Sequence, residues 1–130
     1  MKTIKQVIKF KASPEEVYSA LMSSKKHSAF TGSAAKISNK VGGKFSAYEG
    51  GLYGKNLKLV KNKEIVQEWR CVMDHWPKDH FSKVSFVIKK TKSGSQLIFT
   101  HTQVPDKSYA SIKQGWTDYY WNPMKKFLEN

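Results

Sequence analysis

The sequence has one cysteine, one arginine and no long apolar run. Because Cys71 is alone, the chain cannot form an internal disulfide, and it lacks the cysteine pairs of a structural zinc site. No segment approaches the roughly 20 apolar residues that a membrane-spanning helix needs. Lys5 and Lys9 divide the N-terminal segment, so it has no apolar core of a signal peptide. These absences predict a reduced protein of the cytoplasm that does not insert into a membrane.

The charge of the chain is strongly one-sided, with 23 Lys and Arg against 10 Asp and Glu and a net charge of +13. Such an excess suggests an acidic partner, a nucleic acid or a membrane surface. Base readout and bidentate phosphate binding favour arginine, however, and Arg70 is the only arginine. The lysines are also spread along the chain. We therefore expect no sequence-specific nucleic-acid binding, and a surface that steers an acidic protein.

The N-terminal third of the sequence reads as one strand followed by two short helices. Apolar and lysine side chains alternate over residues 3–10, which is typical of a half-buried strand. In "SPEEVYSALM", Ser13 is a good N-cap, Pro14 suits the first turn, and Glu16 completes a capping box. A second short helix is expected near residues 25–30, before the turn "TGS".

Residues 36–103 have the pattern of an antiparallel meander. Strand-like alternation recurs about every 10 residues, separated by short turns such as the Gly-Gly pairs at residues 42–43 and 50–51. Within one of these strands the alternation places Tyr53, Leu57 and Leu59 on a single face.

A long helix is predicted at the end of the chain, over residues 106–128, from aromatic residues at helical spacing. Pro123 cannot donate to the carbonyl of Tyr119, so a kink or a change of helix is expected there. Gly115 lowers the intrinsic helix stability by about 0.8–1 kcal/mol relative to alanine, which suggests close packing. The aromatic triplet at 119–121 cannot all point inward, so at least one ring should be exposed or lie at a cavity mouth.

This order of elements predicts an α+β helix-grip fold. A curved antiparallel sheet of about six or seven strands needs a helix to cover its concave face, and the C-terminal helix is the only long one. Residues 1–130 are expected to form a single domain.

The segment 69–81, "WRCVMDHWPKDHF", gathers residue types that build nucleophilic sites. A Cys71 nucleophile with His75 or His80 as base would need an exposed and activated thiol. The strand alternation instead puts Cys71 on the same face as Trp69, which indicates a buried and inert cysteine. We expect no catalytic residue here and no enzymatic activity.

A metal site in the same segment would use Asp74, His75, Asp79 and His80. The separation of five residues between the two histidines matches neither a helix face nor a strand face, and Pro77 between them indicates a turn. The segment is predicted to connect two strands, without a metal ion or another cofactor.

Five segments of the sequence, in order, resemble one known family, the C-terminal domain of the activator of heat-shock protein 90 ATPase. They are "SPEEVYSAL", "GGKFSAYEGGLYGKNLKLV", "IVQEWR", "WPKDHFSKVSF" and "QGWTDYY". This resemblance implies the START-like, or birch-pollen-allergen-like, helix-grip superfamily. It also implies a non-enzymatic, co-chaperone-like protein that binds or modulates heat-shock protein 90. In eukaryotic activators a first domain binds the middle segment of the chaperone, and this chain resembles only the second domain.

Two functions follow from these patterns. The first is binding of the acidic chaperone through a lysine-bearing face, with candidates in the densest lysine region: Lys36, Lys40, Lys44, Lys55 and Lys58. The alternative is a carrier or sensor of a small hydrophobic, lipid-like ligand in a cavity between the sheet and the C-terminal helix. Superfamily relatives bind lipids, hormones or polyketides there. The candidate lining residues are Phe45, Leu57, Trp69, Phe86, Phe99, Trp116 and Tyr120.

Overall fold

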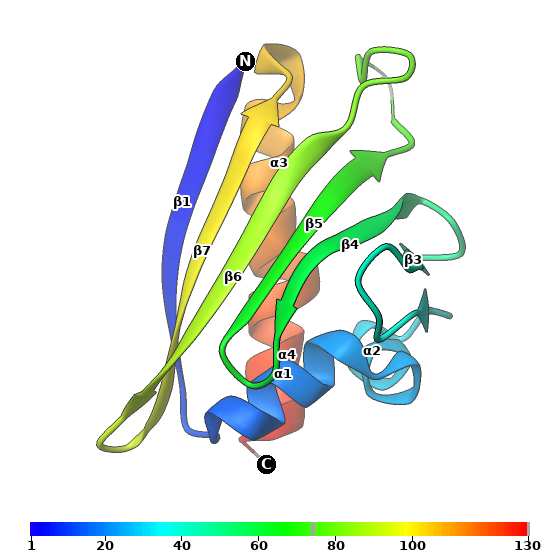
Figure 1. Cartoon of the computed structure of the whole chain (residues 1–130). Coiled ribbons are helices and arrows are strands. Elements are labelled where there is room, and N and C mark those ends of the chain that lie inside the picture. The colour runs from blue at the N-terminus through cyan, green and yellow to red at the C-terminus, as the bar shows by residue number, and fades with distance from the viewer. Residues whose placement is uncertain (74, 130) are drawn as a thin grey trace.

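The computed structural model describes residues 1–73 and 75–129 as a curved sheet crossed by a C-terminal helical rod (Figure 1). The sheet consists of β1 (Lys2–Phe10), β2 (Lys36–Ile37), β3 (Lys44–Ala47), β4 (Leu52–Val60), β5 (Glu64–Cys71), β6 (Ser82–Thr91) and β7 (Gly94–Val104). The helices are α1 (Pro14–Met22), α2 (Ser24–Thr31), the short η1 (Asp106–Ser108), α3 (Tyr109–Trp116), the π-helical η2 (Thr117–Trp121) and α4 (Asn122–Leu128).

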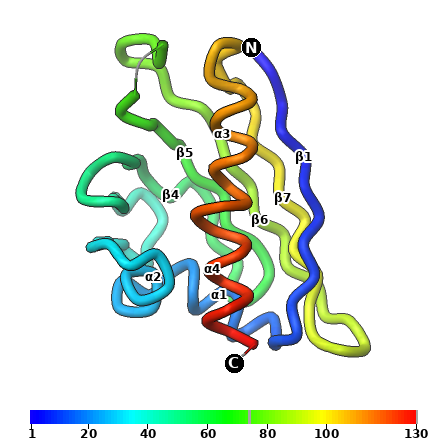
Figure 2. The backbone as a smooth tube through the Cα atoms, turned by 180° about the vertical axis from the view of Figure 1, so that it is seen from behind, coloured from blue at the N-terminus to red at the C-terminus, as the bar shows by residue number. Residues whose placement is uncertain are grey.

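The seven strands form one antiparallel sheet in the order β1-β7-β6-β5-β4-β3-β2. The rod made of α3, η2 and α4 runs across one face, as the view from behind shows (Figure 2), and α2 packs against its lower half. This arrangement confirms the predicted α+β helix-grip fold. Among the described residues, no helix is long and apolar enough to cross a membrane.

Helix α1 begins where the capping box predicts. The Ser13 hydroxyl accepts from the Glu16 N–H at 3.1 Å, and the Glu16 carboxylate accepts from the Ser13 N–H at 3.1 Å. Helix α2 is capped by Ser23 and ends at Gly32, whose φ of 72° is the left-handed conformation that glycine adopts readily.

Strand β4 contains a bulge that the alternation did not predict. The register shifts after Asn56, so Tyr53 pairs with Arg70 on the outer face of the sheet, whereas Leu59 pairs with the buried Ile65 on the inner face. The prediction that Tyr53, Leu57 and Leu59 share one face is therefore wrong.

The inner place that Leu57 would have taken belongs to Asn56, which is fully buried. Its amide donates to the carbonyls of Ser38 and Lys40 at 2.7 and 3.0 Å and accepts from Gln67 at 3.0 Å. Its side-chain hydrogen bonds are thus satisfied, and they tie the β2–β3 connection to the sheet.

The expected change of helix near Pro123 is present. The rod passes from α-helix to π-helix over Thr117–Trp121 and returns to α-helix at Asn122. A π-helical turn inserts one extra residue per turn, so it changes which side chains face the sheet. Here it turns both Tyr120 and Trp121 into the core and leaves Tyr119 60% exposed. The prediction that one ring of the triplet is exposed is confirmed.

Candidate functional site

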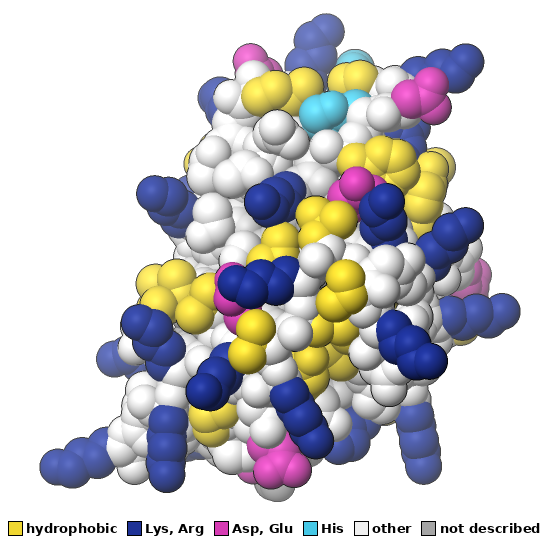
Figure 3. All heavy atoms as spheres, in the orientation of Figure 1, with side chains coloured by type: hydrophobic (Ala, Val, Ile, Leu, Met, Phe, Trp, Pro, Cys, Tyr) yellow, Lys and Arg dark blue, Asp and Glu magenta, His cyan; other side chains and the backbone are white. Residues whose placement is uncertain are grey.

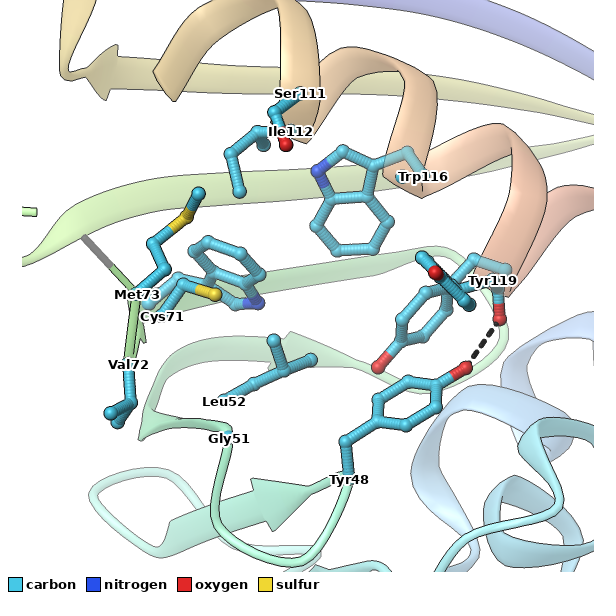
Figure 4. A pocket seen from close by; sticks show the side chains of 13 residues that line it. Tyr48, Gly51, Leu52, Cys71, Val72, Met73, Ser111, Ile112, Trp116 and Tyr119 are labelled. Carbon is cyan, nitrogen blue, oxygen red and sulfur yellow. Dashed lines mark hydrogen bonds between the residues drawn. The ribbon is translucent and has the colours of Figure 1, made fainter. Parts of the chain in front are cut away.

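An open apolar pocket of about 430 Å³ lies between the rod, the end of β5 and the turn from β3 to β4 (Figure 4). The turn and the start of β4 supply Tyr48, Gly51 and Leu52; the end of β5 and the residues after it supply Trp69, Cys71, Val72 and Met73; the rod supplies Ser111, Ile112, Gly115, Trp116, Tyr119 and Tyr120. None of these lining residues carries a formal charge. The site therefore suits an uncharged, apolar group.

A buried hydrogen-bond chain links the side chain of Trp116 to the backbone of Trp69 in the pocket wall. The indole N–H of Trp116 donates to Nδ1 of His101 at 3.0 Å, so the imidazole proton is on Nε2 and donates to Ser82 Oγ at 2.7 Å. Ser82 Oγ donates in turn to the carbonyl of Trp69 at 3.0 Å. Burial lowers the pKa of His101 to about 3, so the ring is neutral.

The Ser82–His101 pair does not form a nucleophilic site. A serine nucleophile needs a histidine nitrogen that accepts its proton. In this chain the imidazole donates to the hydroxyl, and the hydroxyl donates to a backbone carbonyl. Both side chains are also fully enclosed. The pair orients the pocket wall.

A second buried histidine holds Tyr120 in place. His27 donates through Nδ1 to the carbonyl of Leu21 at 3.1 Å, so its Nε2 accepts from the Tyr120 hydroxyl at 2.9 Å. Burial lowers the pKa of His27 and raises that of Tyr120 well above its usual value, which keeps both groups neutral. The side chain of Tyr120 is thus a fixed wall of the pocket.

Tyr48 fastens the β3–β4 turn to the rod. Its hydroxyl donates to the carbonyl of Tyr119 at 2.9 Å, and the two rings meet edge to face at 5.8 Å (Figure 4). Tyr48, Glu49 and Gly50 have φ values of 51°, 56° and 88°, a left-handed run that is unusual for the first two residues. Burial, followed by the effect of Tyr119, raises the pKa of Tyr48 to about 12, so it remains a donor.

Gly115 leaves the rod side of the pocket open. A Cβ built on it would meet only the Tyr119 ring, at an ordinary contact distance of 3.7 Å. The expectation that Gly115 allows close packing is therefore wrong, since nothing approaches it closely. Its lack of a side chain instead adds to the space between Ile112 and Trp116.

The predicted lining residues are distributed over several places. Trp69, Trp116 and Tyr120 line the pocket. Phe45 and Phe86 contribute to a separate internal space of only about 20 Å³, which holds at most one water. Two candidates line none of the described cavities: Phe99, which is fully buried, and Leu57, which lies at the β4 bulge and is 39% exposed.

Sequence reasoning missed much of the pocket. Tyr48, Leu52 and Met73 line it from the β3–β4 turn, the first residue of β4 and the segment after β5. Turn geometry of this kind leaves no periodic signal in a sequence. The aromatic triplet was the one signal, because it indicated an exposed ring where Tyr119 stands.

The predicted lysine candidates lie on one side of the molecule, around β2, β3 and β4, and all are exposed. Lys44 and Lys55 are cross-strand neighbours. Two of the five have acidic neighbours: Lys55 lies 4.0 Å from Glu68, and Lys58 lies 3.0 Å from Glu64.

The segment after β5 forms a turn held by Arg70. The guanidinium of Arg70 donates to the carbonyls of Pro77 and His80 at 2.6 and 3.1 Å. The indole N–H of Trp76 also donates to the His80 carbonyl, at 2.8 Å, and the His80 ring donates to the carbonyl of Gln103 at 2.8 Å. These contacts give the segment an architectural role.

Among the described residues of that turn, the nucleophilic and metal-binding types do not converge on one site. Burial, only partly offset by the charge of Arg70, raises the pKa of the Cys71 thiol, so it is not activated. Asp74 lies outside the described residues. Within residues 1–73 and 75–129, no three His, Cys, Asp or Glu side chains gather in a way that could hold a metal ion.

Comparison with known proteins gives one consistent family. The model of the family described as "Activator of Hsp90 ATPase homolog 1-like protein" matches residues 11–129. The human activator of 90 kDa heat shock protein ATPase homolog 1 is 30% identical over 90% of this chain and 34% of its own length. The homologue from Dictyostelium discoideum is 33% identical over 88% of this chain and 30% of its own length. The chain thus spans about a third of the curated relatives it matches.

Solved structures share the fold. An HSP90 activator from Plasmodium falciparum superimposes with a TM-score of 0.89 at 24% identity, covering 99% of this chain and 97% of that one. The solution structure of the Aha1 dimer from Colwellia psychrerythraea gives 0.82 at 24% identity, with the same coverage of both chains.

Proposed function

We propose a co-chaperone role from the premise that this chain belongs to the activator of Hsp90 ATPase homolog 1-like family. In this role the chain binds a heat-shock protein 90 and modulates its ATPase without catalysing a reaction itself. The observation that carries the proposal is the family match over residues 11–129, together with 30% identity to a named human activator over 90% of the chain.

The charge of the chain supports an acidic partner. The net charge is +13, and Lys36, Lys40 and Lys44 are exposed and make no ion pair with any described residue. An exposed lysine surface accelerates association with an acidic surface more than it tightens the final complex. It is also screened by salt. Binding should therefore be faster and stronger at low ionic strength.

Calorimetric titration of the chain into the heat-shock protein 90 of the same organism tests this role, run at low and at high salt. We expect saturable binding that weakens as salt rises, accompanied by a change in the ATPase rate of the chaperone. Absence of binding at both salt concentrations would contradict the proposal. A lysine-rich protein of similar size and unrelated fold serves as the control for charge alone.

A second candidate function is binding of a small apolar ligand in the pocket. The observation that favours it is an uncharged cavity of about 430 Å³ beside a helix glycine that no packing requires. Its volume lies within the roughly 300–1,000 Å³ of typical ligand pockets. The rings of Trp69, Trp116 and Tyr119 suit an uncharged molecule with a ring system or a short acyl chain.

Native mass spectrometry of freshly purified protein tests the ligand role. We expect an added mass that disappears on denaturation and is absent from Gly115→Leu, whose side chain would enter the pocket. Gly115→Ala is the matched control, because it removes the glycine and adds only one methyl group. Retention of the same added mass in Gly115→Leu would contradict this second function.

The proposal further includes a cytoplasmic location and action of residues 1–130 as one domain. Cell fractionation checks the first of these. Limited proteolysis checks the second, because a single domain should resist cleavage between its ends and lose its protected core in one step.

A further inference from the structure

The outer face of the sheet, which lies opposite the rod, carries a row of side chains across five strands that is apolar on every strand except β5. The strand registers align Val7 with Ile98, Ile98 with Val87, Val87 with Glu64, and Glu64 with Val60. At about 4.8 Å between strands the row is roughly 19 Å long. Val7 is 60% exposed and Val60 38%, and Ile98 and Val87 are partly exposed.

Lysines border this row on both sides. These lysines lie two residues along a strand from the row, a distance of roughly 6.6 Å. Lys9 and Lys89 lie on one side of it, and Lys5 and Lys58 lie on the other. Lys58 is bonded to Glu64, the one acid of the row, at 3.0 Å. The other three lysines make no ion pair with any described residue. Figure 3 shows this face, with yellow apolar groups among dark blue side chains.

One end of the row opens into a hollow. Val60, Glu64, Val87 and Lys89 line part of a shallow space of about 620 Å³ beside the turn that joins β4 to β5. The row therefore offers a partner a recess at its β4 end and a flat apolar strip at its β1 end.

Strand propensity alone does not account for an exposed apolar row. Threonine satisfies the preference of strands for β-branched residues as valine does. The neighbouring outward positions of β7 are Thr100 and Thr102. An antiparallel sheet with one face in water normally presents polar side chains on that face. The valine and isoleucine side chains thus form an apolar strip that the described residues leave partly exposed.

We propose that this row is the centre of a docking surface for an acidic protein face that carries a matching apolar strip. The inference rests on the proposed function, and the partner is the heat-shock protein 90 of that proposal. Apolar contacts exclude water at the middle, and partner carboxylates meet Lys5, Lys9 and Lys89 at the margins.

The chemistry of the row and its margins favours a protein over other polyanions. The row has no aromatic side chain on which a base could stack, and its margin has no arginine for bidentate phosphate contacts. Its short β-branched side chains are also held against the sheet. They lack the reach of the tryptophan, phenylalanine and leucine residues that insert into a membrane surface.

The triple variant Val7→Thr/Val87→Thr/Ile98→Thr tests the apolar part. It keeps β-branching on every strand and removes only the apolar contact. Calorimetric titration against the chaperone should show affinity lower by roughly tenfold or more. The control Val41→Thr changes a residue that is 64% exposed and lies outside both the row and the pocket, and its affinity should stay within about twofold.

The charged part is tested with Lys5→Glu/Lys89→Glu, against Lys25→Glu/Lys113→Glu on α2 and α3. Both pairs change the net charge equally. The first pair should weaken binding and remove much of its salt dependence, whereas the second should do neither. Amide spectra and thermal unfolding of each variant establish that it is folded before its affinity is compared.

The outcomes separate this inference from the function on which it rests. If the unaltered chain does not bind the chaperone, the proposed function is overturned and this surface with it. If the unaltered chain binds and the row variants bind as tightly as their controls, only the docking surface is overturned. The docking surface is also overturned if the row variants lose co-sedimentation with phosphatidylserine vesicles but keep chaperone binding, because the row then contacts a membrane. It is overturned as well if the amide signals of the row shift with the concentration of the chain alone, because the row then joins two copies of the chain.

Discussion

The Tyr48 hydroxyl donates a hydrogen bond of 2.9 Å to the backbone carbonyl of Tyr119. In a regular α-helix that carbonyl would accept from the N–H of residue 123, but Pro123 has none. The turn after β3 thus supplies a donor to a carbonyl that Pro123 cannot bond, and it closes one side of the apolar pocket in doing so. This hydrogen bond therefore connects the left-handed turn after β3 to the part of the rod that the internal proline alters.

Replacing Tyr48 by phenylalanine keeps the ring and removes the donor. We expect the free energy of unfolding to fall by about 0.5–1.5 kcal/mol, as for the loss of one hydrogen bond. In a Pro123→Ala background the same change should cost less, because residue 123 then has an N–H of its own. Urea denaturation of the four proteins measures the coupling. Equal costs in both backgrounds would show that the hydroxyl does not replace the missing donor.

Gly115→Ala should raise the free energy of unfolding by about 0.8–1 kcal/mol. Alanine is the better helix former, and its Cβ meets only an ordinary contact with the Tyr119 ring. Thermal and urea denaturation measure the change. Destabilisation would mean that the rod is packed more tightly at this position than its open surroundings indicate.

Acid should destabilise the fold through His101. Burial holds its folded-state pKa at about 3, below the usual 6.5, so the unfolded chain takes up the proton first as pH falls. The stability it contributes is complete above about pH 6.5 and is lost toward pH 3. The slope approaches about 1.4 kcal/mol per pH unit. Burial lowers the pKa of His27 as well, which acts in the same direction.

Urea denaturation between about pH 7.5 and pH 4.5 measures this slope. His101→Gln cannot titrate, so it should be less stable at neutral pH and show a flatter dependence. A slope as steep as that of the unaltered chain would place the acid sensitivity elsewhere.

Changes in β5 and in the turn after it should separate buried from exposed residues. Trp69→Ala removes a buried ring and should cost about 3–5 kcal/mol, whereas His75→Ala should change stability by no more than about 0.5 kcal/mol. His80→Ala should cost about 0.5–1.5 kcal/mol, because its ring donates to the Gln103 carbonyl. Urea denaturation orders the three. A large cost for His75 would contradict its exposed position in the turn.

Local rules in the sequence predicted much of the fold. The capping box fixed the start of α1 at Ser13, and Pro123 located the departure from α-helix. The capping box and the proline both act within about one helical turn. Alternation gave the two faces of β1 over residues 4–10 correctly, because its register against β7 is regular there. It failed in β4, where Asn56 is drawn inward by three side-chain hydrogen bonds that join distant segments.

The site was less predictable than the fold. The shape of the pocket depends on where two turns fold over a curved sheet, and on buried partners such as His27 and His101 that are far away in sequence. The sequence alone does not show that a histidine will be neutral and buried. The outer apolar row is likewise invisible until the strand registers place Val7, Ile98 and Val87 side by side.

Titration of the isotope-labelled chain with the heat-shock protein 90 of the same organism, followed by amide spectra at low and high salt, tests the central claim most directly. We predict shifts concentrated at the outward positions of β1, β7 and β6, around Val7, Ile98 and Val87, that diminish as salt rises. No shift at either salt concentration would contradict chaperone binding. Shifts confined to the pocket residues of the rod would contradict the docking surface.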